Sequence, residues 1–212
     1  MNQKDVFLAS EGDAWYERNR AALAARAWPD DDPVLRALLE LGDGELRGRE
    51  VFEVGCGEAL RLEWLQRERA CRCSGVEPSA RAVEAARRRG VSVHQGTADR
   101  LPRDDQSVDV LIFGFCLYLC DRSDLFRVAA EADRVLRSPG WILIQDFHAS
   151  SPTSRDYHHR PGVRTYKMDY RQLFTWHPQY QCLSHLVRHH ETGLYTDSLD
   201  DQVAVSVLRK RA

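Results

Sequence analysis

The sequence has no long apolar run, no excess of either charge and no paired-cysteine motif, and each absence narrows what the chain can be. Among the first ten residues only Val6-Phe7-Leu8 is continuously apolar, which is too short for a signal sequence or a membrane span. The 30 basic and 32 acidic residues give a net charge of −2, so the composition does not suggest a nucleic-acid partner. We therefore expect a cytoplasmic protein that does not bind membranes.

The cysteines and histidines do not form a recognisable metal motif. The six cysteines lack a C-x-x-C spacing, and several lie in or just after expected buried strands, where a free thiol behaves as a small apolar group. Adjacent histidines, as in His158-His159 and His189-His190, point to opposite sides of an extended chain, and carboxylate-plus-histidine spacings are absent. We expect neither disulfides nor a metal site.

Strand-like and helix-like patterns alternate from residue 34 onward, which predicts an α/β fold with a mainly parallel sheet and helices on both faces. No internal repeat or linker divides the 212 residues, so we expect a single domain. Its expected parts are a helical cap (1–45), a core (46–147), an irregular substrate-specificity segment (148–180) and carboxy-terminal edge strands (181–212). The expected strands are 51–54, 72–76, 91–95, 108–113 and 141–147, followed by a hairpin of 182–188 and 202–208 at the edge of the sheet.

The most informative feature is a strand that runs into a glycine turn, V-F-E-V-G-C-G-E-A at 51–59, with Glu77 about 20 residues after Gly57. This spacing is typical of a bound nucleoside, whose ribose the acid would contact. The dinucleotide fingerprint requires a third glycine where Leu60 stands, and the carboxylate of Glu53 precedes the turn. Both details favour S-adenosylmethionine, which carries an ammonium and a sulfonium, over NAD.

Five motifs occur in a characteristic order: E-V-G-C-G at 53–57, G-V-E-P at 75–78, G-T-A-D-R-L-P at 96–102, V-D-V-L-I-F at 108–113 and V-L-R-S-P-G-W-I-L-I at 135–144. Together they resemble the class I S-adenosylmethionine-dependent methyltransferases. The resemblance implies a Rossmann-like, seven-stranded, mostly parallel sheet whose last strand is antiparallel. A narrower likeness, in G-D-A-W-Y-E-R-N at 12–19, D-F-H-A-S-S-P at 146–152 and Y-K-M-D-Y at 166–170, is to methylases associated with pseudaminic acid biosynthesis.

The resemblance also implies that S-adenosylmethionine is the cofactor and S-adenosylhomocysteine the product, and it indicates which residues bind them. The amides of Gly55 and Gly57 would face the methionine half of the cofactor, Glu53 its ammonium, Arg18 its carboxylate and Glu77 its ribose. Thr97 departs from the acidic residue usual at the adenine, and Asp99 is a possible substitute. The complete expected set is Tyr16, Arg18, Glu53, Gly55, Cys56, Gly57, Glu77, Pro78, Thr97, Ala98, Asp99, Phe113 and Phe115.

The acceptor side is predicted from its position beyond the fifth strand. The catalytic candidates there are Asp146, His148, Tyr157 and His158, with His159 beside them, and His148 is the preferred base because an unperturbed histidine titrates near neutrality. We expect a pocket of mixed character that contains tyrosine and histidine.

The expected reaction is methyl transfer to an oxygen or nitrogen, including that of a carboxylate, of a small polar metabolite such as a sugar or natural-product intermediate, by a monomer or homodimer. The alternatives are methylation of protein, peptide or nucleic acid, a binding protein without turnover, and a nicotinamide-dependent oxidoreductase. The last lacks support because Leu60 replaces the third glycine and no Y-x-x-x-K motif is present. After the fourth strand, F-G-F-C at 113–116 is unlike the N-P-P-Y of nucleic-acid amino methylases.

Overall fold

The computed structural model describes residues 2–212. An almost continuous amino-terminal helix consists of α1 (Gln3–Val6), a π-helical turn (Phe7–Glu11) and α2 (Gly12–Ala24). Two short helices, α3 (Pro33–Leu39) and α4 (Asp43–Leu46), lead into the sheet. Asp32 begins α3 by accepting a hydrogen bond from the amide of Leu35, and a proline follows at the first helical position, as is common at helix starts.

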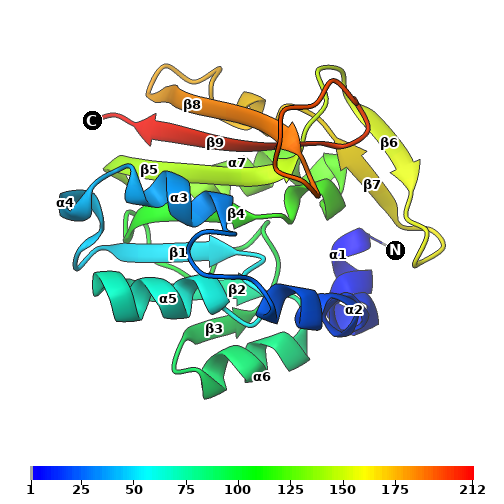
Figure 1. Ribbon diagram of the computed structural model, residues 1–212, viewed down its shortest axis with the longest axis horizontal. Helices are drawn as coiled ribbons and strands as arrows, with labels where there is room; N and C mark the ends of the chain where they lie inside the picture. The colour runs from blue at the N-terminus through cyan, green and yellow to red at the C-terminus, as the bar shows by residue number, and fades with distance from the viewer. Residues whose placement is uncertain (1) are drawn as a thin grey trace.

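A seven-stranded sheet forms the centre of the molecule, in the order β3-β2-β1-β4-β5-β9-β8 (Figure 1). Its strands are β1 (Glu50–Val54), β2 (Arg72–Glu77), β3 (Ser92–Gln95), β4 (Val108–Gly114), β5 (Leu136–Phe147), β8 (Tyr180–His189) and β9 (Gln202–Lys210). All pairs from β3 to β5 are parallel, whereas β9 is antiparallel to both β5 and β8. The predicted sheet, with its antiparallel last strand, is confirmed.

Helices cover both faces of this sheet, as predicted. On one face α3, α5 (Leu60–Arg69) and α6 (Ala80–Arg88) pack on Val51, Val110 and Leu143; on the other, α7 (Leu125–Val135) packs on Phe52, Leu111 and Ile142. Figure 1 shows α3 and α5 in front of the sheet and α7 behind it. Because neighbouring residues of a strand face opposite sides, β4, which is apolar except for Asp109, supplies both cores.

The fifth strand begins at Leu136, five residues before its predicted start at Trp141. Leu136 pairs with Val108, and a register shift separates this pair from the regular pairing of Val110 with Trp141. Pro139 and Gly140 lie in between, in the irregular part of the strand, where a missing ladder hydrogen bond is tolerated.

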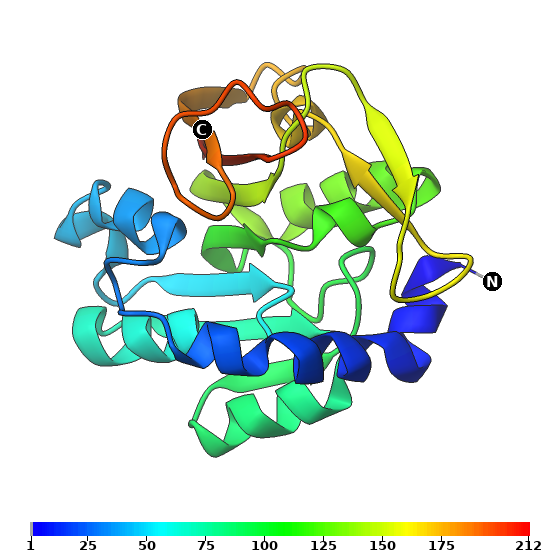
Figure 2. The ribbon, with the colours of Figure 1, turned by 45° about the vertical axis from the view of Figure 1, so that its right-hand side comes forward.

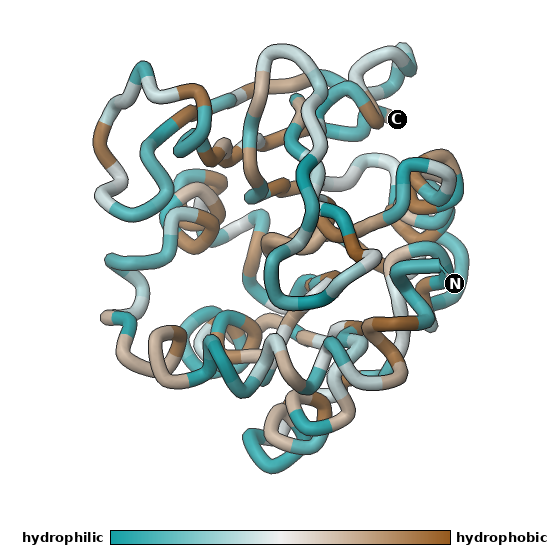
Figure 3. Tube along the Cα trace, turned by 90° about the vertical axis from the view of Figure 1, so that its right-hand side faces the viewer, coloured by the Kyte–Doolittle hydropathy of each residue, from teal (hydrophilic) through white to brown (hydrophobic). Residues whose placement is uncertain are grey.

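The predicted irregular segment after β5 contains a small sheet of its own. Strands β6 (Thr153–Asp156) and β7 (Arg164–Lys167) form an antiparallel hairpin, followed by a 3-10 turn at Tyr170–Leu173. Figures 2 and 3 show this hairpin, largely hydrophilic, standing beyond the carboxyl ends of the parallel strands, on the side where the amino-terminal helix also lies. The hairpin was missed because its strands are short and polar on both faces, so that no apolar alternation marks them.

Within residues 2–212, none of the helices has the length and apolar character required to cross a membrane.

Candidate functional site

Two adjoining cavities open at the carboxyl ends of β1, β2 and β4, where parallel sheets commonly bind ligands. The inner cavity is lined by Glu77, Pro78, Thr97, Ala98 and Asp99, and the outer one by Glu53, Gly57, Tyr157, His158 and His159. Both cavities share Trp15, Gly55, Gly114 and Phe115. The residues expected at the ribose and adenine are thus separated from those expected at the methionine half and the acceptor.

The glycine turn requires backbone angles that favour glycine. Gly55 and Gly57 have φ values of +71° and +54°, and a Cβ on Gly55 would lie 2.6 Å from the Cβ of Cys116. Their amides do not point to a ligand as expected: the Gly55 amide donates to the carbonyl of Val76, and that of Gly57 to Glu77. The turn therefore shapes the cavity wall without offering these two donors.

Glu77 is buried at the end of β2 and is held by backbone amides alone. One carboxylate oxygen accepts from Gly57 (2.9 Å) and the other from Ser79 (3.0 Å). Each oxygen keeps a second lone pair that can accept a hydroxyl from the inner cavity, which Glu77 lines. Burial without a cationic partner raises the pKa of Glu77 to about 7.

Glu53 belongs to a buried ionic group that the sequence did not reveal. Arg61, on the first turn of α5, donates to one oxygen of Glu53 and to both oxygens of Asp32, the latter at 3.2 and 2.8 Å. Burial alone would raise the pKa of Asp32, but Arg61 outweighs this and lowers it. For Glu53, burial and the charge of Asp32 prevail over Arg61, and its pKa rises to about 7.

The second oxygen of Glu53 has no hydrogen-bond partner among the described residues, although it is buried. Arg26 also pairs with Asp32, at 3.7 Å, so Asp32 has two guanidinium partners, whereas Glu53 shares Arg61 with it. A buried carboxylate oxygen without a donor is costly, so the site is suited to a cation that donates hydrogen bonds. An ammonium group in the outer cavity would supply the missing donor.

The end of β4 brings the backbone close to this carboxylate. A Cβ on Gly114 would overlap an oxygen of Glu53, so only glycine fits there. The next residue, Phe115, has a φ of +66°, a strained angle for a bulky side chain, and its ring lies between the two cavities. Phe113, in contrast, is fully buried, packs against Phe174 and lines neither cavity.

At the far end of the inner cavity, Asp99 is already paired. Its oxygens accept from the hydroxyl of Thr97 (2.6 Å) and from the ammonium of Lys4 (2.7 Å), which brings α1 to the cavity wall. Thr97, Ala98 and Asp99 all line this end, in agreement with their expected place near adenine.

The amino-terminal helix packs directly over the turn after β2. A Cβ on Gly12 would come within 3.0 Å of the amide of Ser79, and Asp13 accepts from the Ser79 hydroxyl at 2.6 Å. Tyr16 and Arg18, which were expected at the cofactor, have partners within the protein. Tyr16 donates to Glu58, and Arg18 to Glu11 and to the hydroxyl of Tyr157; neither side chain lines a cavity.

The outer cavity has the mixed lining that the sequence predicted. Tyr118 and Tyr157, with His158, His159 and His190, share the wall with Phe147 and with two cationic residues from the hairpin, Arg155 and Lys167. Burial and the nearby Arg155 lower the pKa of Lys167, whose ammonium lies 4.8 Å from the Phe147 ring centre. The wall is therefore basic and aromatic.

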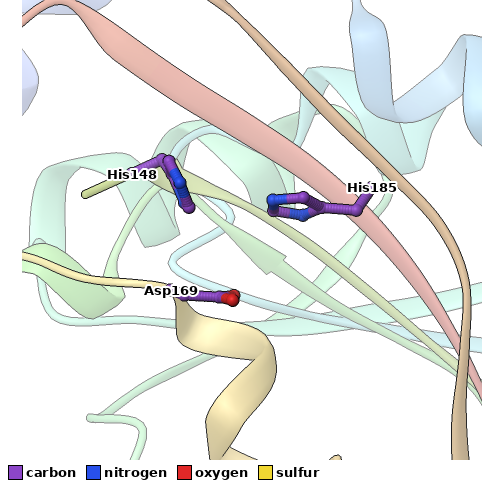
Figure 4. A group of neighbouring side chains, drawn as sticks. All are labelled: His148, Asp169 and His185. Carbon is purple, nitrogen blue, oxygen red and sulfur yellow. The ribbon is translucent and has the colours of Figure 1, made fainter. Parts of the chain in front are cut away.

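Two of the four catalytic candidates lie outside both cavities. Asp146 is buried and accepts from the amides of Leu117, Tyr118 and Phe147, so it ties the end of β5 to the turn after β4. His148, the preferred base, clusters with Asp169 and His185 (Figure 4). The alternation of side chains along β5 places these two residues away from the cavity, leaving Tyr157 and His158 as candidates.

Sequence reasoning missed several wall residues that only the fold brings together: Trp15, Arg61, Tyr118, Gln145, Lys167 and His190. Trp15 and Lys167 stand inside motifs that carried the narrower resemblance, which was a usable signal. Cys56, which was expected at the cofactor, lines the outer cavity, but its thiol is directed at Gly75 of β2, where a Cβ would lie 2.6 Å from the sulfur.

Comparison with known proteins agrees with this geometry. Residues 52–144 match the family described as "Methyltransferase domain". The fatty-acid O-methyltransferase of Mycolicibacterium smegmatis is 32% identical over 107 residues, covering 48% of this chain and 38% of that protein. Phthiotriol/phenolphthiotriol dimycocerosates methyltransferase 1 of Mycobacterium ulcerans is 30% identical over 112 residues, covering 50% and 41%. The match thus spans about two fifths of these curated relatives.

Among solved structures, one similar chain is the 1,6-didemethyltoxoflavin-N1-methyltransferase of Burkholderia thailandensis, determined with its substrate and S-adenosylhomocysteine. It has a TM-score of 0.70 at 15% identity, covering 98% of this chain and 89% of that one. At such identity the likeness concerns the fold. The chain therefore has the Rossmann-like fold seen in class I methyltransferases, and residues 52–144 match the methyltransferase-domain family.

Proposed function

We propose that this protein transfers a methyl group from S-adenosylmethionine to an oxygen or nitrogen of a small polar metabolite, with a carboxylate, a sugar or a natural-product intermediate as the acceptor class. The observation that carries the proposal is the unsatisfied oxygen of Glu53. Glu53 lines a cavity that adjoins the Glu77 cavity, and a carboxylate oxygen without a donor there complements the cofactor's ammonium.

The residues present fit the cofactor. Glu77 would accept the two ribose hydroxyls, Thr97 to Asp99 would border the adenine, and Glu53 would accept from the ammonium. When bound, S-adenosylmethionine supplies a methyl group made electrophilic by its sulfonium. Phe115 and Trp15, at the junction of the cavities, would exclude water from the space between sulfur and acceptor.

On the acceptor side, this chain's own residues would orient the nucleophile and, where it holds a proton, remove it. Arg155 and Lys167 bring two cationic side chains to the wall, beside Asp156, and these suit an anionic or polar acceptor. We propose His158 as the base candidate, with Tyr157 placing the acceptor. The sequence likeness to methylases associated with pseudaminic acid biosynthesis favours a sugar-derived acceptor.

The decisive experiment measures S-adenosylhomocysteine release with panels of sugar acids, other carboxylates, amines and planar heterocycles. We expect turnover with an anionic or polar small molecule and loss of it in Glu77→Ala. A matched control is Glu84→Ala, because Glu84 is an exposed glutamate on the neighbouring helix. Tight NAD binding without affinity for either adenosyl compound would overturn the proposal.

Two alternatives have distinct outcomes in the same experiment. Activity on RNA or on protein, but on no small molecule, would show that the acceptor is a macromolecule. Affinity for the cofactor without turnover on small molecules or cell extract would identify a binding protein.

A further inference from the structure

The three side chains of His148, Asp169 and His185 meet outside both cavities, although they are far apart in the sequence. They come from the end of β5, from the residue that begins the 3-10 turn after β7, and from β8. One ligand-type atom from each residue lies within 4.8 Å of the other two, and Figure 4 shows the side chains directed toward a common space. Two imidazoles and one carboxylate are a ligand set for first-row divalent metals.

The hydrogen bonds of the two histidine rings leave nitrogens available to a metal. Nδ1 of His148 is buried without a hydrogen-bond partner among residues 2–212. Nδ1 of His185 lies 2.9 Å from the Ser206 hydroxyl, an outer contact of the kind that leaves Nε2 free to bind a metal.

The carboxylate of Asp169 already pairs with the guanidinium of Arg171, on the same 3-10 turn. Arg171 donates to both of its oxygens, at 2.9 and 2.6 Å, and the Arg171 amide donates to one of them. Oδ1 accepts two of these hydrogen bonds, so only Oδ2, which accepts one, keeps a lone pair for a metal, and the arginine would orient the carboxylate. The positive charge of Arg171 nevertheless opposes a dication, so it weakens the site.

We propose that His148, Asp169 and His185 form a binding site for one divalent transition-metal ion of the Zn²⁺ type. The ion would join the end of β5, the specificity segment and the edge strand β8. Asp169 lies two residues after Lys167, which lines the outer cavity. The ion would therefore hold the acceptor wall in place, and its role is structural. The site does not depend on the proposed methyl transfer.

The test uses the full chain, stripped with a chelator and titrated with Zn²⁺ by calorimetry. We expect one ion per chain, an increase in melting temperature with Zn²⁺, and affinity weakened by about tenfold or more in His148→Gln and in His185→Gln. His94→Gln, at an exposed position of β3, is the matched control, and it should bind Zn²⁺ with the affinity of the unchanged protein. Arg171→Gln should bind Zn²⁺ more tightly, because the opposing charge is removed.

S-adenosylhomocysteine affinity serves as the folding control for each variant. Co²⁺ replaces Zn²⁺ as a spectroscopic probe, because thiolate ligands give a near-ultraviolet charge-transfer band that nitrogen and oxygen ligands do not. Absence of saturable binding, equal binding in the His148→Gln and His185→Gln variants, or a thiolate band from Cys71 and Cys73 would each overturn the proposal.

Discussion

Glu53 and Glu77 end neighbouring strands and are both buried, yet their surroundings differ. Glu77 is held by two amides and faces the inner cavity, whereas Glu53 shares one arginine with Asp32 and keeps an oxygen without a donor. A buried carboxylate held by neutral dipoles gains from added hydroxyl donors, and one with an unmet oxygen gains from a cation. The two acids are therefore suited to different parts of one ligand.

Replacement of Glu77 by alanine should weaken S-adenosylhomocysteine binding by roughly a hundredfold, because hydrogen bonds to a charged group contribute about 1.5–3 kcal/mol each. Calorimetric titration of Glu77→Ala and of the Glu84→Ala control measures this directly. Urea unfolding of both variants separates lost binding from lost structure. An affinity within about threefold of the unchanged protein would remove Glu77 from the site.

Ala59 begins α5 with a φ of +62°, an angle that alanine adopts only at a cost of about 1–2 kcal/mol. Ala59→Gly should therefore stabilise the protein by roughly 0.5–1 kcal/mol, the relief being partly offset by the larger unfolded-state entropy of glycine. Urea unfolding provides the measurement. Ala37→Gly, within helix α3, is the opposite control and should destabilise by about 1 kcal/mol. Equal loss in both variants would contradict the strain argument.

At the scale of elements, the amino-terminal helix and the segment around the β6–β7 hairpin hold each other over the cavities. Arg18 donates to Tyr157 (2.9 Å), the Arg164 amide donates to Gln3 (2.5 Å), and Phe7 packs in one cluster with Tyr157 and Val163. Arg18 and Tyr157 are thus joined to each other, and the guanidinium of Arg18 is directed to the hairpin segment. We infer that the two elements cover the site as one unit.

Tyr157→Phe, which removes only the hydroxyl that accepts from Arg18, should speed amide exchange in both 2–24 and 153–167. Hydrogen exchange followed by mass spectrometry resolves the two segments. Arg20→Ala, on the same helix but exposed and paired with Glu17, should leave both rates unchanged. Faster exchange in 153–167 alone would show that the two elements move independently.

For the whole molecule, three buried carboxyl groups, those of Glu53, Glu77 and Asp146, have pKa values raised to about 7, chiefly by burial. The folded state therefore binds more protons than the unfolded state between about pH 4 and pH 7. The contribution of these groups to the free energy of unfolding is fully present below about pH 4 and is lost as the pH rises through about 7. A cofactor that donates to the ionised forms reverses part of this effect.

We accordingly expect these three groups to make the cofactor-free protein less stable at pH 8 than at pH 5.5. Bound S-adenosylhomocysteine should reduce this difference in stability between the two pH values. Its affinity should rise with pH up to about 7 and then level off. Urea midpoints at both pH values, with and without the ligand, measure the first effect, and calorimetry measures the second. An affinity independent of pH between 5.5 and 8 would contradict this linkage.

The sequence by itself determined the sheet, its helices and the glycine turn, because apolar periodicity and glycine positions are local properties of the chain. It also indicated that Glu53, Glu77 and Thr97 to Asp99 would lie along one edge of the sheet, where they line the two cavities, since parallel strands bring their carboxyl ends to one edge. Only the tertiary structure decided which side chains line the cavities. Arg61 meets Asp32 across 29 residues, Asp146 and His148 turn away from the cleft, and Lys167 arrives on a polar hairpin. Such pairings depend on packing between distant segments, which no local pattern records.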